Sequence, residues 1–219
     1  MNLIFQYMKQ IIILGPQGAG KGTQANIIAE FLGIKSLSSG EMLRKAILKK
    51  TELGQKIKEL YNKGSLIPDN DMIALIREEL GEYDYKKGFV LDGFPRNIIQ
   101  AKALDKYYNI DKVLNIDISD KEAVRRIQGR LICANGHIFN THIKQASKGD
   151  VCSICGKLLY SREDDKTEAV MKRLSIYHHN TVKLLDYYQK QNKLVVFNGL
   201  GSIEDVSKKI LEYLKNHVR

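Results

Sequence analysis

The chain lacks the features that mark secreted, membrane-spanning and repetitive proteins. It has three cysteines in 219 residues, and this odd count does not make the disulfide framework of a small secreted domain. No apolar run approaches the roughly 20 residues of a membrane-spanning helix. Residues 1–8 have neither the basic segment nor the long apolar core of a signal peptide, and we expect residues 1–7 to be a dispensable extension. We find no internal repeat or low-complexity tract. A globular, cytoplasmic protein without a membrane partner is predicted.

Acidic residues are outnumbered by basic ones. The 35 lysines and arginines against 25 aspartates and glutamates give a net charge of +10, which raises the question of nucleic acid. There is no long basic tail, and much of the excess lysine falls on expected helix faces, where solvation explains it. Charge alone therefore leaves open a nucleic-acid-binding protein and an enzyme whose arginines gather around polyphosphates.

A glycine-rich segment behind a short apolar run is the most informative feature that is present. Gln10–Leu14 is typical of a strand buried on both faces, and Gln24–Leu32 favours a helix that ends at Gly33. The segment between them would aim backbone N–H groups and a helix dipole at one point, which suits a phosphate. Lys21 would add a charge on the β- and γ-phosphates. The predicted phosphate-binding residues here are Gly15, Gly18, Ala19, Gly20, Lys21, Gly22 and Thr23.

Strands alternate with helices along most of the remaining chain. Further strands are predicted to end near Leu37 and to cover Gly88–Leu91, Lys112–Ile118 and Leu194–Phe197. Helices are predicted after Ser39 as N-cap, over Glu52–Lys63, Asp69–Leu80, Ile98–Lys106, Lys121–Arg130 and Asp164–Lys190, and from Ile203. This alternation predicts an α/β fold with a parallel sheet flanked by helices. Residues 131–161 interrupt this alternation of strands and helices and have no helical period, which indicates an insertion.

One carboxylate and several arginines stand where phosphate chemistry would use them. Asp92 follows a buried strand, at the edge where open α/β sheets bind ligands, and we expect it to partner Mg²⁺ through water. Arg126 and Arg130 lie four residues apart and are expected on one helix face. The arginines near strand ends and borders of the insertion are Arg44, Arg96, Arg126, Arg130, Arg162 and Arg173. Several guanidinium groups so placed suit a transferred phosphoryl group.

Taken in order, these segments resemble the adenylate kinases, a family of nucleoside monophosphate kinases. The likeness runs from about Lys9 to the end of the chain and rests on Gly15–Thr23, Ser38–Arg44, Gly88–Arg96 with Gln100, Arg126 with Arg130, and Arg162–Asp165 with Arg173. It implies a P-loop NTPase-type sheet with an inserted helical lobe for the monophosphate and an inserted small β-rich lid of the long form. The implied core is 1–37, 68–129 and 163–219, the lobe 38–67 and the lid 130–162.

The resemblance also implies the reaction and the residues that perform it. The expected reaction is MgATP + AMP ⇌ 2 ADP, by in-line transfer in a monomer that binds nucleotides and no nucleic acid. The implied catalytic residues are Lys21, Asp92, Arg96, Arg126, Arg130, Arg162 and Arg173. ATP would contact the glycine-rich segment, Arg126, Arg130 and Gly201. AMP would contact Ser39, Arg44, Leu66, Ile67, Gly93, Arg96, Gln100, Arg162 and Arg173. Asp164 and Asp165 would assist closure of the lid, which excludes water.

Three alternatives remain at this point. A UMP/CMP kinase differs only in the acceptor; the Ser39 hydroxyl and the Gln100 amide favour AMP, whereas Asn97 also occurs in those relatives. A zinc-ribbon nucleic-acid-binding protein would use the positive charge but does not require the Asp-Gly-Phe-Pro-Arg segment at 92–96. A switch GTPase would need an Asn-Lys-x-Asp segment after the glycine-rich loop, and the chain has none.

The two ends of the insertion carry metal-ligand residue types. The predicted zinc ligands are Cys133, His137, Cys152 and Cys155. A Cys-x₂-Cys pair with an upstream Cys/His pair can complete a tetrahedral Zn²⁺ site. Gly136 stands where zinc-bearing lids of the family have a second cysteine. The first candidate for the fourth ligand is therefore His137, and the weaker candidate is His142. Free thiols in a lid held by hydrogen bonds are the alternative. A bound zinc would be structural, because a small lobe with few core residues needs a metal or a cross-link to be stable.

Overall fold

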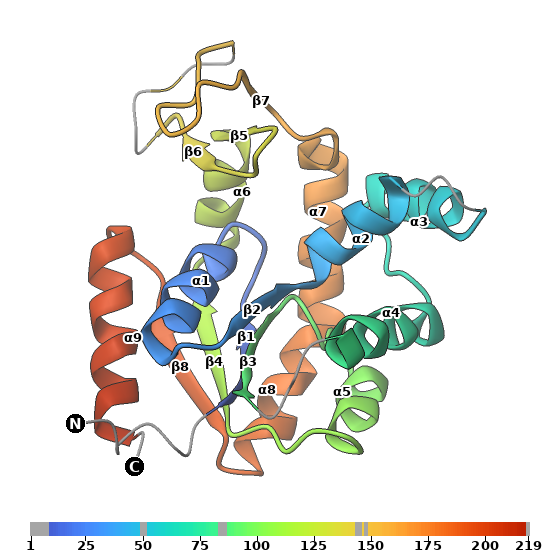
Figure 1. Ribbon diagram of the computed structural model, residues 1–219, viewed down its shortest axis with the longest axis vertical. Coiled ribbons are helices and arrows are strands. Elements are labelled where there is room, and N and C mark those ends of the chain that lie inside the picture. The colour runs from blue at the N-terminus through green and yellow to red at the C-terminus, as the bar shows by residue number, and fades with distance from the viewer. Residues whose placement is uncertain (1–8, 49–51, 83–86, 143–145, 147–148, 218–219) are drawn as a thin grey trace.

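The computed structural model describes residues 9–48, 52–82, 87–142, 146 and 149–217 (Figure 1). The expectation for residues 1–7 lies outside these ranges. Within them, no helix combines the length and the apolar character that crossing a membrane demands.

Five parallel strands form the central sheet. They are β1 (Gln10–Leu14), β2 (Lys35–Ser38), β3 (Phe89–Asp92), β4 (Lys112–Asp117) and β8 (Leu194–Asn198), in the order β2-β3-β1-β4-β8. Strands β3 and β2 lie on one side of β1, and strands β4 and β8 lie on its other side. The loops after β1 and β3 therefore meet at the carboxyl edge of the sheet, where such folds bind ligands. The predicted α/β fold with a parallel sheet is confirmed.

Helices cover both faces of this sheet (Figure 1). They are α1 (Lys21–Leu32), α2 (Ser39–Leu48), α3 (Glu52–Asn62), α4 (Asp69–Glu82), α5 (Ile98–Asp105), α6 (Asp120–Gln128), α7 (Thr167–Ile176), α8 (Val182–Gln189) and α9 (Ile203–His217). Helices α2 and α3 project to one side of the sheet as a separate helical pair, whereas α1 and α9 lie against one face.

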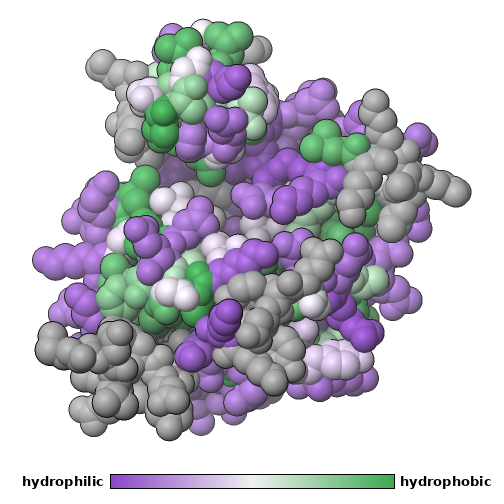
Figure 2. Space-filling model, in the orientation of Figure 1, coloured by the Kyte–Doolittle hydropathy of each residue, from purple (hydrophilic) through white to green (hydrophobic). Residues whose placement is uncertain are grey.

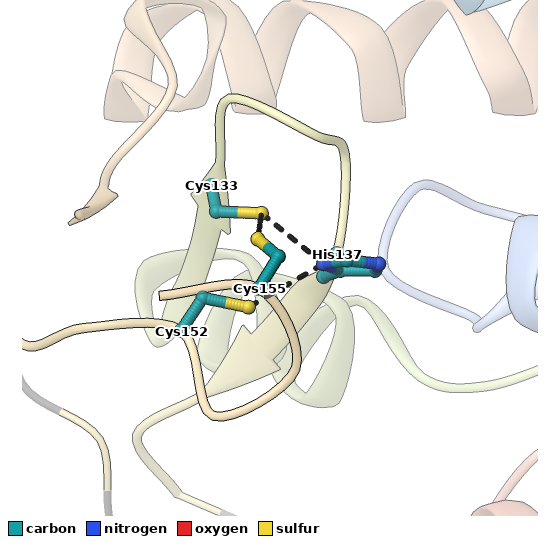
Figure 3. Close-up of side chains that lie close together, drawn as sticks. All are labelled: Cys133, His137, Cys152 and Cys155. Atoms are coloured by element: carbon teal, nitrogen blue, oxygen red, sulfur yellow. Dashed lines mark hydrogen bonds between the residues drawn. The ribbon is translucent and has the colours of Figure 1, made fainter. Parts of the chain in front are cut away.

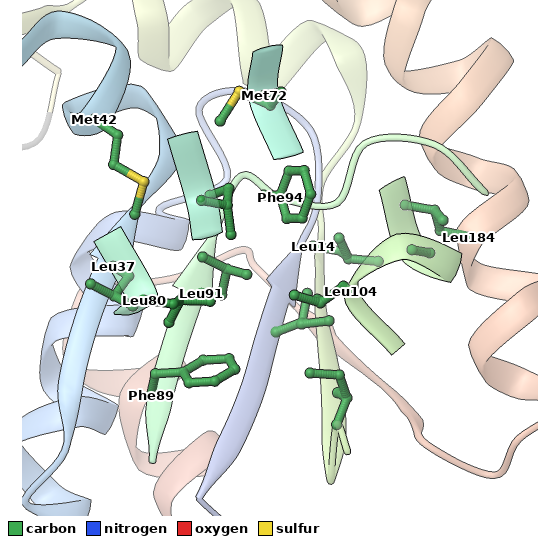
Figure 4. Packing of buried hydrophobic residues seen from close by; sticks show 14 of the residues in the cluster. Leu14, Leu37, Met42, Met72, Leu80, Phe89, Leu91, Phe94, Leu104 and Leu184 are labelled. Carbon is green, nitrogen blue, oxygen red and sulfur yellow. The ribbon is translucent and has the colours of Figure 1, made fainter. Parts of the chain in front are cut away.

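Alternate residues of β1 belong to different hydrophobic clusters. Ile11 and Ile13 pack with residues of α1, α6, α7 and α9. Ile12 and Leu14 pack with residues of α4, α5 and α8, and Figure 4 shows this second cluster around Phe94 and Leu91. Side chains alternate between the faces of a strand, so burial of both faces explains the unbroken apolar run. Each buried isoleucine stabilises the fold by about 1.5–3 kcal/mol, which fixes β1 and the start of the loop that follows it.

Helix α1 begins earlier than its predicted start at Gln24. Its first residue is Lys21, because Gly20 adopts a left-handed conformation with φ 87° and lets the glycine-rich turn run directly into the helix. The predicted end at Gly33 is confirmed, since this glycine has φ 65° and its N–H reaches the carbonyl oxygens of Ala29 and Glu30. Helix α2 likewise begins at Ser39 itself, so Ser39 is its first residue and not the predicted N-cap.

The long helix predicted from about Asp164 to Lys190 is confirmed from Thr167 to Gln189, but its predicted first residues are not part of it. Glu163–Asp165 forms a separate 3₁₀ turn (η2), and Lys166 is extended with ψ 140° before α7 starts at Thr167. A π-helical turn, Tyr177–Thr181 (η3), then joins α7 to α8. Within it the Thr181 hydroxyl donates to the carbonyl oxygen of Arg96 at 3.1 Å. Asp164 and Asp165 therefore lie on a turn of their own.

A small antiparallel sheet, called the lid below, sits above α6 in Figure 1. Its strands are β5 (Arg130–Cys133), β6 (Ile138–Asn140) and β7 (Leu159–Tyr160), in the order β6-β5-β7. The prediction of a β-rich insertion is confirmed. The predicted helix face shared by Arg126 and Arg130 is wrong, because α6 ends at Gln128 and Arg130 opens the strand.

Candidate active site

The turn after β1 is shaped by glycines that admit no side chain. Gly15 has φ 140°, and a Cβ on it would collide with the carbonyl oxygen of Ile116. Gly18 has φ 85°, and a Cβ there would lie 2.8 Å from the carbonyl oxygen of Ala123. The loop therefore packs tightly against β4 and α6 while its backbone N–H groups lead into the amino end of α1. This arrangement fits a bound phosphate.

Lys21 stands at the first position of α1. Its ammonium donates to the carbonyl oxygen of Pro16 at 2.8 Å. Burial lowers the pKa of Lys21 to about 8; the Asp92 carboxylate opposes this shift, and Arg96 and Arg130 add to it. A polyanion beside these groups would restore the charged ammonium.

Asp92 ends β3 in register with Ile13 of β1 and Ser38 of β2. Its Oδ2 would lie 3.3 Å from a Cβ on Gly22, so the carboxylate rests against the first turn of α1. Its Oδ1 is buried and has no hydrogen-bond partner among the described residues. Burial raises the pKa of Asp92, whereas Lys21 and other cations lower it. An unpartnered carboxylate oxygen beside a phosphate cradle fits a hydrated Mg²⁺, which prefers oxygen ligands.

Arg96 is held by the turn that follows β3. Its Nε donates to the carbonyl oxygen of Gly93 at 2.9 Å, and its backbone N–H donates to Gln100 Oε1 at 2.8 Å. Gln100 is 1% exposed, and its amide nitrogen donates to Asp69 Oδ1 at 2.7 Å. Gln100 thus fixes the Arg96 turn to α4. Gly93 has φ 77° and lies close to Ser39, whose Oγ would be 2.5 Å from an added Cβ.

The Ser39 hydroxyl is buried and has no hydrogen-bond partner within the described ranges. On the same helix, Arg44 donates to the Tyr61 hydroxyl at 2.9 Å. Ile67 is 5% exposed and belongs to the second hydrophobic cluster, the one that contains Ile12 and Leu14. Leu66 is partly exposed. The structure therefore brings Ser39 and Gly93 together.

Arg162 and Arg173 share the carboxylate of Asp164. Arg162 donates from Nε and Nη2 at 2.8 and 2.6 Å, and Arg173 donates from Nη1 at 2.8 Å. Burial would raise the pKa of Asp164, but these two guanidinium groups hold it at about 2. Arg162 also donates to the Tyr61 hydroxyl at 2.5 Å. Asp164 thereby holds Arg162, at the end of the lid, together with Arg173, in the last turn of α7.

Arg126 and Arg130 are held by separate partners at the other border of the lid. Arg126 donates to Glu122 Oε1 at 2.7 Å and to the carbonyl oxygen of Gly199 at 3.0 Å, in the loop that also holds Gly201. Arg130 forms a two-pronged ion pair with Asp165, with Nε 2.8 Å from Oδ2. Both borders of the lid are therefore tied to the core by ion pairs.

Four metal-ligand side chains converge in the lid. Cys133, His137, Cys152 and Cys155 have their ligand atoms within 4.8 Å of one another (Figure 3). His137 Nδ1 lies 3.4 Å from the sulfurs of Cys133 and Cys152, and the Cys133 and Cys155 sulfurs are 3.6 Å apart. Zn²⁺ bonds of about 2.0–2.3 Å in a tetrahedron require ligand separations of this size. His142 is exposed and stands outside the cluster.

Comparison with known proteins identifies the family. The adenylate kinase family model matches residues 13–193. The chain belongs to the adenylate kinase family. A 46% identical adenylate kinase of Caldicellulosiruptor bescii aligns over 211 residues, 94% of this chain and 98% of the relative. Those of Methanosarcina barkeri and Archaeoglobus fulgidus are each 44% identical, over 94% and 99% of this chain and 98% and 100% of their own lengths.

These findings confirm the predicted enzyme class. The chain is an adenylate kinase, an enzyme of phosphoryl transfer that binds nucleotides and uses ATP with magnesium. Its chain length and three-stranded lid agree with the long-lid form. Figure 2 shows this lid as a lobe set off from the body by a hollow, with mainly hydrophilic surface below it.

Sequence analysis missed three residues that organise the site of this adenylate kinase. Asp69 accepts from Gln100 and Asn97, Tyr61 contacts three of the arginines, and Glu122 holds Arg126. Only the role of Glu122 could have been predicted from the sequence, because Glu122 stands four residues before Arg126 on an expected helix and this spacing favours an ion pair. The other two act across long sequence separations, which no local pattern reveals.

Proposed function

We propose that this adenylate kinase transfers the γ-phosphoryl group of ATP in line to AMP, in the space between the glycine-rich loop and Arg96. The main support is the pairing of the phosphate cradle at the start of α1 with the unpartnered Oδ1 of Asp92. They end the adjacent strands β1 and β3, so phosphate and magnesium would bind side by side.

The two nucleotides would occupy opposite sides of this space. ATP would contact the backbone of residues 15–23, Lys21, Arg126, Arg130 and Gly201. AMP would contact Ser39, Arg44, Gly93, Arg96, Gln100, Arg162 and Arg173, with the backbone at Leu66 and Ile67 beside the base. The buried, unpartnered Ser39 hydroxyl supports this acceptor side, because a buried polar group needs a partner.

This chemistry needs no general base in the protein. The AMP phosphate is already an anion at neutral pH, so the protein has to align two polyanions and offset their repulsion. Lys21, Arg96, Arg126, Arg130, Arg162 and Arg173 are the cations assigned to this task. When bound, Mg²⁺ would neutralise charge on the phosphate chain, and Asp92 would hold it through water.

Closure of the lid would keep water away from the transferred group. Asp165 and Asp164 already engage Arg130, Arg162 and Arg173 at the lid borders, which supports a role for both carboxylates in setting the lid position. We assign residues 38–67 to the monophosphate lobe, 130–162 to the lid, and 1–37, 68–129 and 163–219 to the core.

We further propose that the four-residue cluster binds a structural Zn²⁺. The three thiols and one imidazole are ordinary zinc ligands at suitable separations. All four positions are supplied by the protein, so the ion would have no open place for substrate. Burial would raise the pKa of the Cys133 thiol, but backbone groups of His137 and Asn135 help hold it at about 7, and this favours the thiolate that zinc requires.

The acceptor is tested by initial rates with AMP, CMP, UMP and GMP at a fixed concentration of MgATP. We expect AMP to be preferred by at least about 100-fold in kcat/KM, since the base is read by buried polar groups. A preference for CMP or UMP would instead assign the chain to the pyrimidine alternative. A monomer in the cytoplasm that does not bind nucleic acid stays a prediction.

A further inference from the structure

Tyr61, in the last turn of α3, contacts three arginines at once. Its hydroxyl lies 2.9 Å from Nη1 of Arg44 and 2.5 Å from Nη2 of Arg162. Its carbonyl oxygen accepts from Nη2 of Arg173 at 3.0 Å, and the guanidinium carbon of Arg173 lies 5.1 Å from the centre of its ring.

The arginines come from three separate parts of the chain. Arg44 lies on α2, Arg162 at the end of the lid and Arg173 on α7. Arg162 and Arg173 are also bound by Asp164, but Arg44 is joined to them through Tyr61. Tyr61 therefore links the helical lobe to the border between lid and core.

The backbone at the end of α3 holds Tyr61 in place. Gly64 has φ 66° and packs so closely on α7 that a Cβ would lie 2.5 Å from the carbonyl oxygen of Ala169. Next to it, the Lys172 ammonium donates to the Ser65 hydroxyl at 2.8 Å. These contacts seat the end of the lobe on α7, so the Tyr61 ring and hydroxyl face the arginines in a fixed position.

We propose that Tyr61 is a positioning residue for the acceptor side of the reaction. A phenol oxygen can accept from two guanidinium groups, and an aromatic face can support a third, without supplying a full negative charge. A carboxylate in this place would compete with phosphate for the same cations. Tyr61 thereby gathers three positive groups without adding to the negative charge that Asp164 already places beside Arg162 and Arg173. This inference rests on the acceptor-side roles proposed above for Arg44, Arg162 and Arg173.

The test is the Tyr61→Phe variant, which removes the hydroxyl and retains both the ring and the backbone carbonyl. We expect KM for AMP to rise about 5–20-fold and kcat to fall about 3–10-fold, because two charge-assisted hydrogen bonds are lost. KM for ATP should stay within about twofold, because the hydroxyl contacts no residue on the donor side.

Tyr187→Phe is the matched control. The Tyr187 hydroxyl donates to Asp105 Oδ2 at 2.6 Å, between α8 and α5, away from the proposed site. This variant makes the same chemical change and should leave kcat and both KM values within about twofold of the parent enzyme. Both variants can lower the melting temperature. If only Tyr61→Phe raises KM for AMP while leaving KM for ATP unchanged, Tyr61 positions the acceptor side and is not merely a structural contact.

Arg162→Ala distinguishes failure of this inference from failure of the proposed site. If Tyr61→Phe keeps the parent KM for AMP and kcat while Arg162→Ala loses activity, the role of Tyr61 is overturned and the site stands. If Arg162→Ala also transfers phosphate at the parent rate, the acceptor-side assignment itself is wrong, and the role of Tyr61 falls with it.

Discussion

At the scale of single residues, Lys21 is placed where its own charge is costly in the free protein. Burial and two nearby arginines oppose the ammonium, and Asp92 alone favours it. A polyphosphate would reverse this balance, so the binding of nucleotide and the protonation of Lys21 are linked. The same logic holds for Asp92, whose buried Oδ1 has no hydrogen-bond partner among the described residues and would gain one from a hydrated cation.

This linkage predicts the pH dependence of ATP binding. The free protein loses the Lys21 proton as pH rises through about 8, whereas the bound state retains it. Affinity for ATP should therefore be level below about pH 8 and fall by up to about tenfold per pH unit above it. Equilibrium binding of MgATP between about pH 7 and 9.5 measures this, because bound Mg²⁺ keeps the terminal phosphate ionised over that range. An affinity that stays level to the alkaline end would contradict the linkage, and Lys21→Arg, whose charge is fixed, should abolish the break.

Removing a cation that acts on the phosphoryl group should cost far more activity than stability. We expect Lys21→Met or Arg96→Ala to lower kcat by about 10²–10⁴, because each removes charge stabilisation from the transition state. A coupled assay of ADP formation measures the rate, and circular dichroism with a melting curve checks the fold. Near-parent rates in either folded variant would refute its assignment.

At the scale of elements, the lid has little apolar core of its own. Among its described residues the buried cluster comprises five, and two of these are cysteines of the proposed metal site. A lobe of this size needs a cross-link or a bound metal in addition to its hydrophobic contacts. Three short strands and the four-residue cluster together hold it, while ion pairs at Arg130 and Arg162 attach it to the core.

Removal of metal should therefore affect stability before activity. We expect chelation to lower the melting temperature by several degrees, at about 2–4 °C for each kcal/mol of stability lost in a chain of 219 residues, while activity at low temperature changes little. His137→Ala should lower zinc content in metal analysis, and His142→Ala is the matched control that should not. An unchanged melting curve after metal removal would argue for free thiols.

At the scale of the whole molecule, two inserted lobes stand over one carboxyl edge of the sheet (Figure 1). Six arginines from α2, the β3 turn, α6, β5, the lid border and α7 are directed to this region by ion pairs and hydrogen bonds. These six arginines contribute to the net charge of +10.

A site built for two facing nucleotides should bind a molecule that spans both. We expect a mimic of two adenosines joined by five phosphates to compete with ATP and with AMP, and to bind more tightly than either alone by at least about 100-fold. Calorimetry and steady-state inhibition measure this. Competition against ATP alone would show that the acceptor side lies elsewhere.

The sequence by itself determined the parallel α/β fold, the phosphate loop, the β-rich lid and the family. These depend on signals between neighbouring residues, such as the apolar run of β1, the glycine spacing after it and the Cys-x₂-Cys pair. Only the tertiary structure decided that Arg130 lies on a strand, that Asp164 stands on a separate turn and that His137 joins the cysteines. It alone disclosed Tyr61 and Asp69, because hydrogen bonds between residues far apart in the chain leave no periodic or local pattern.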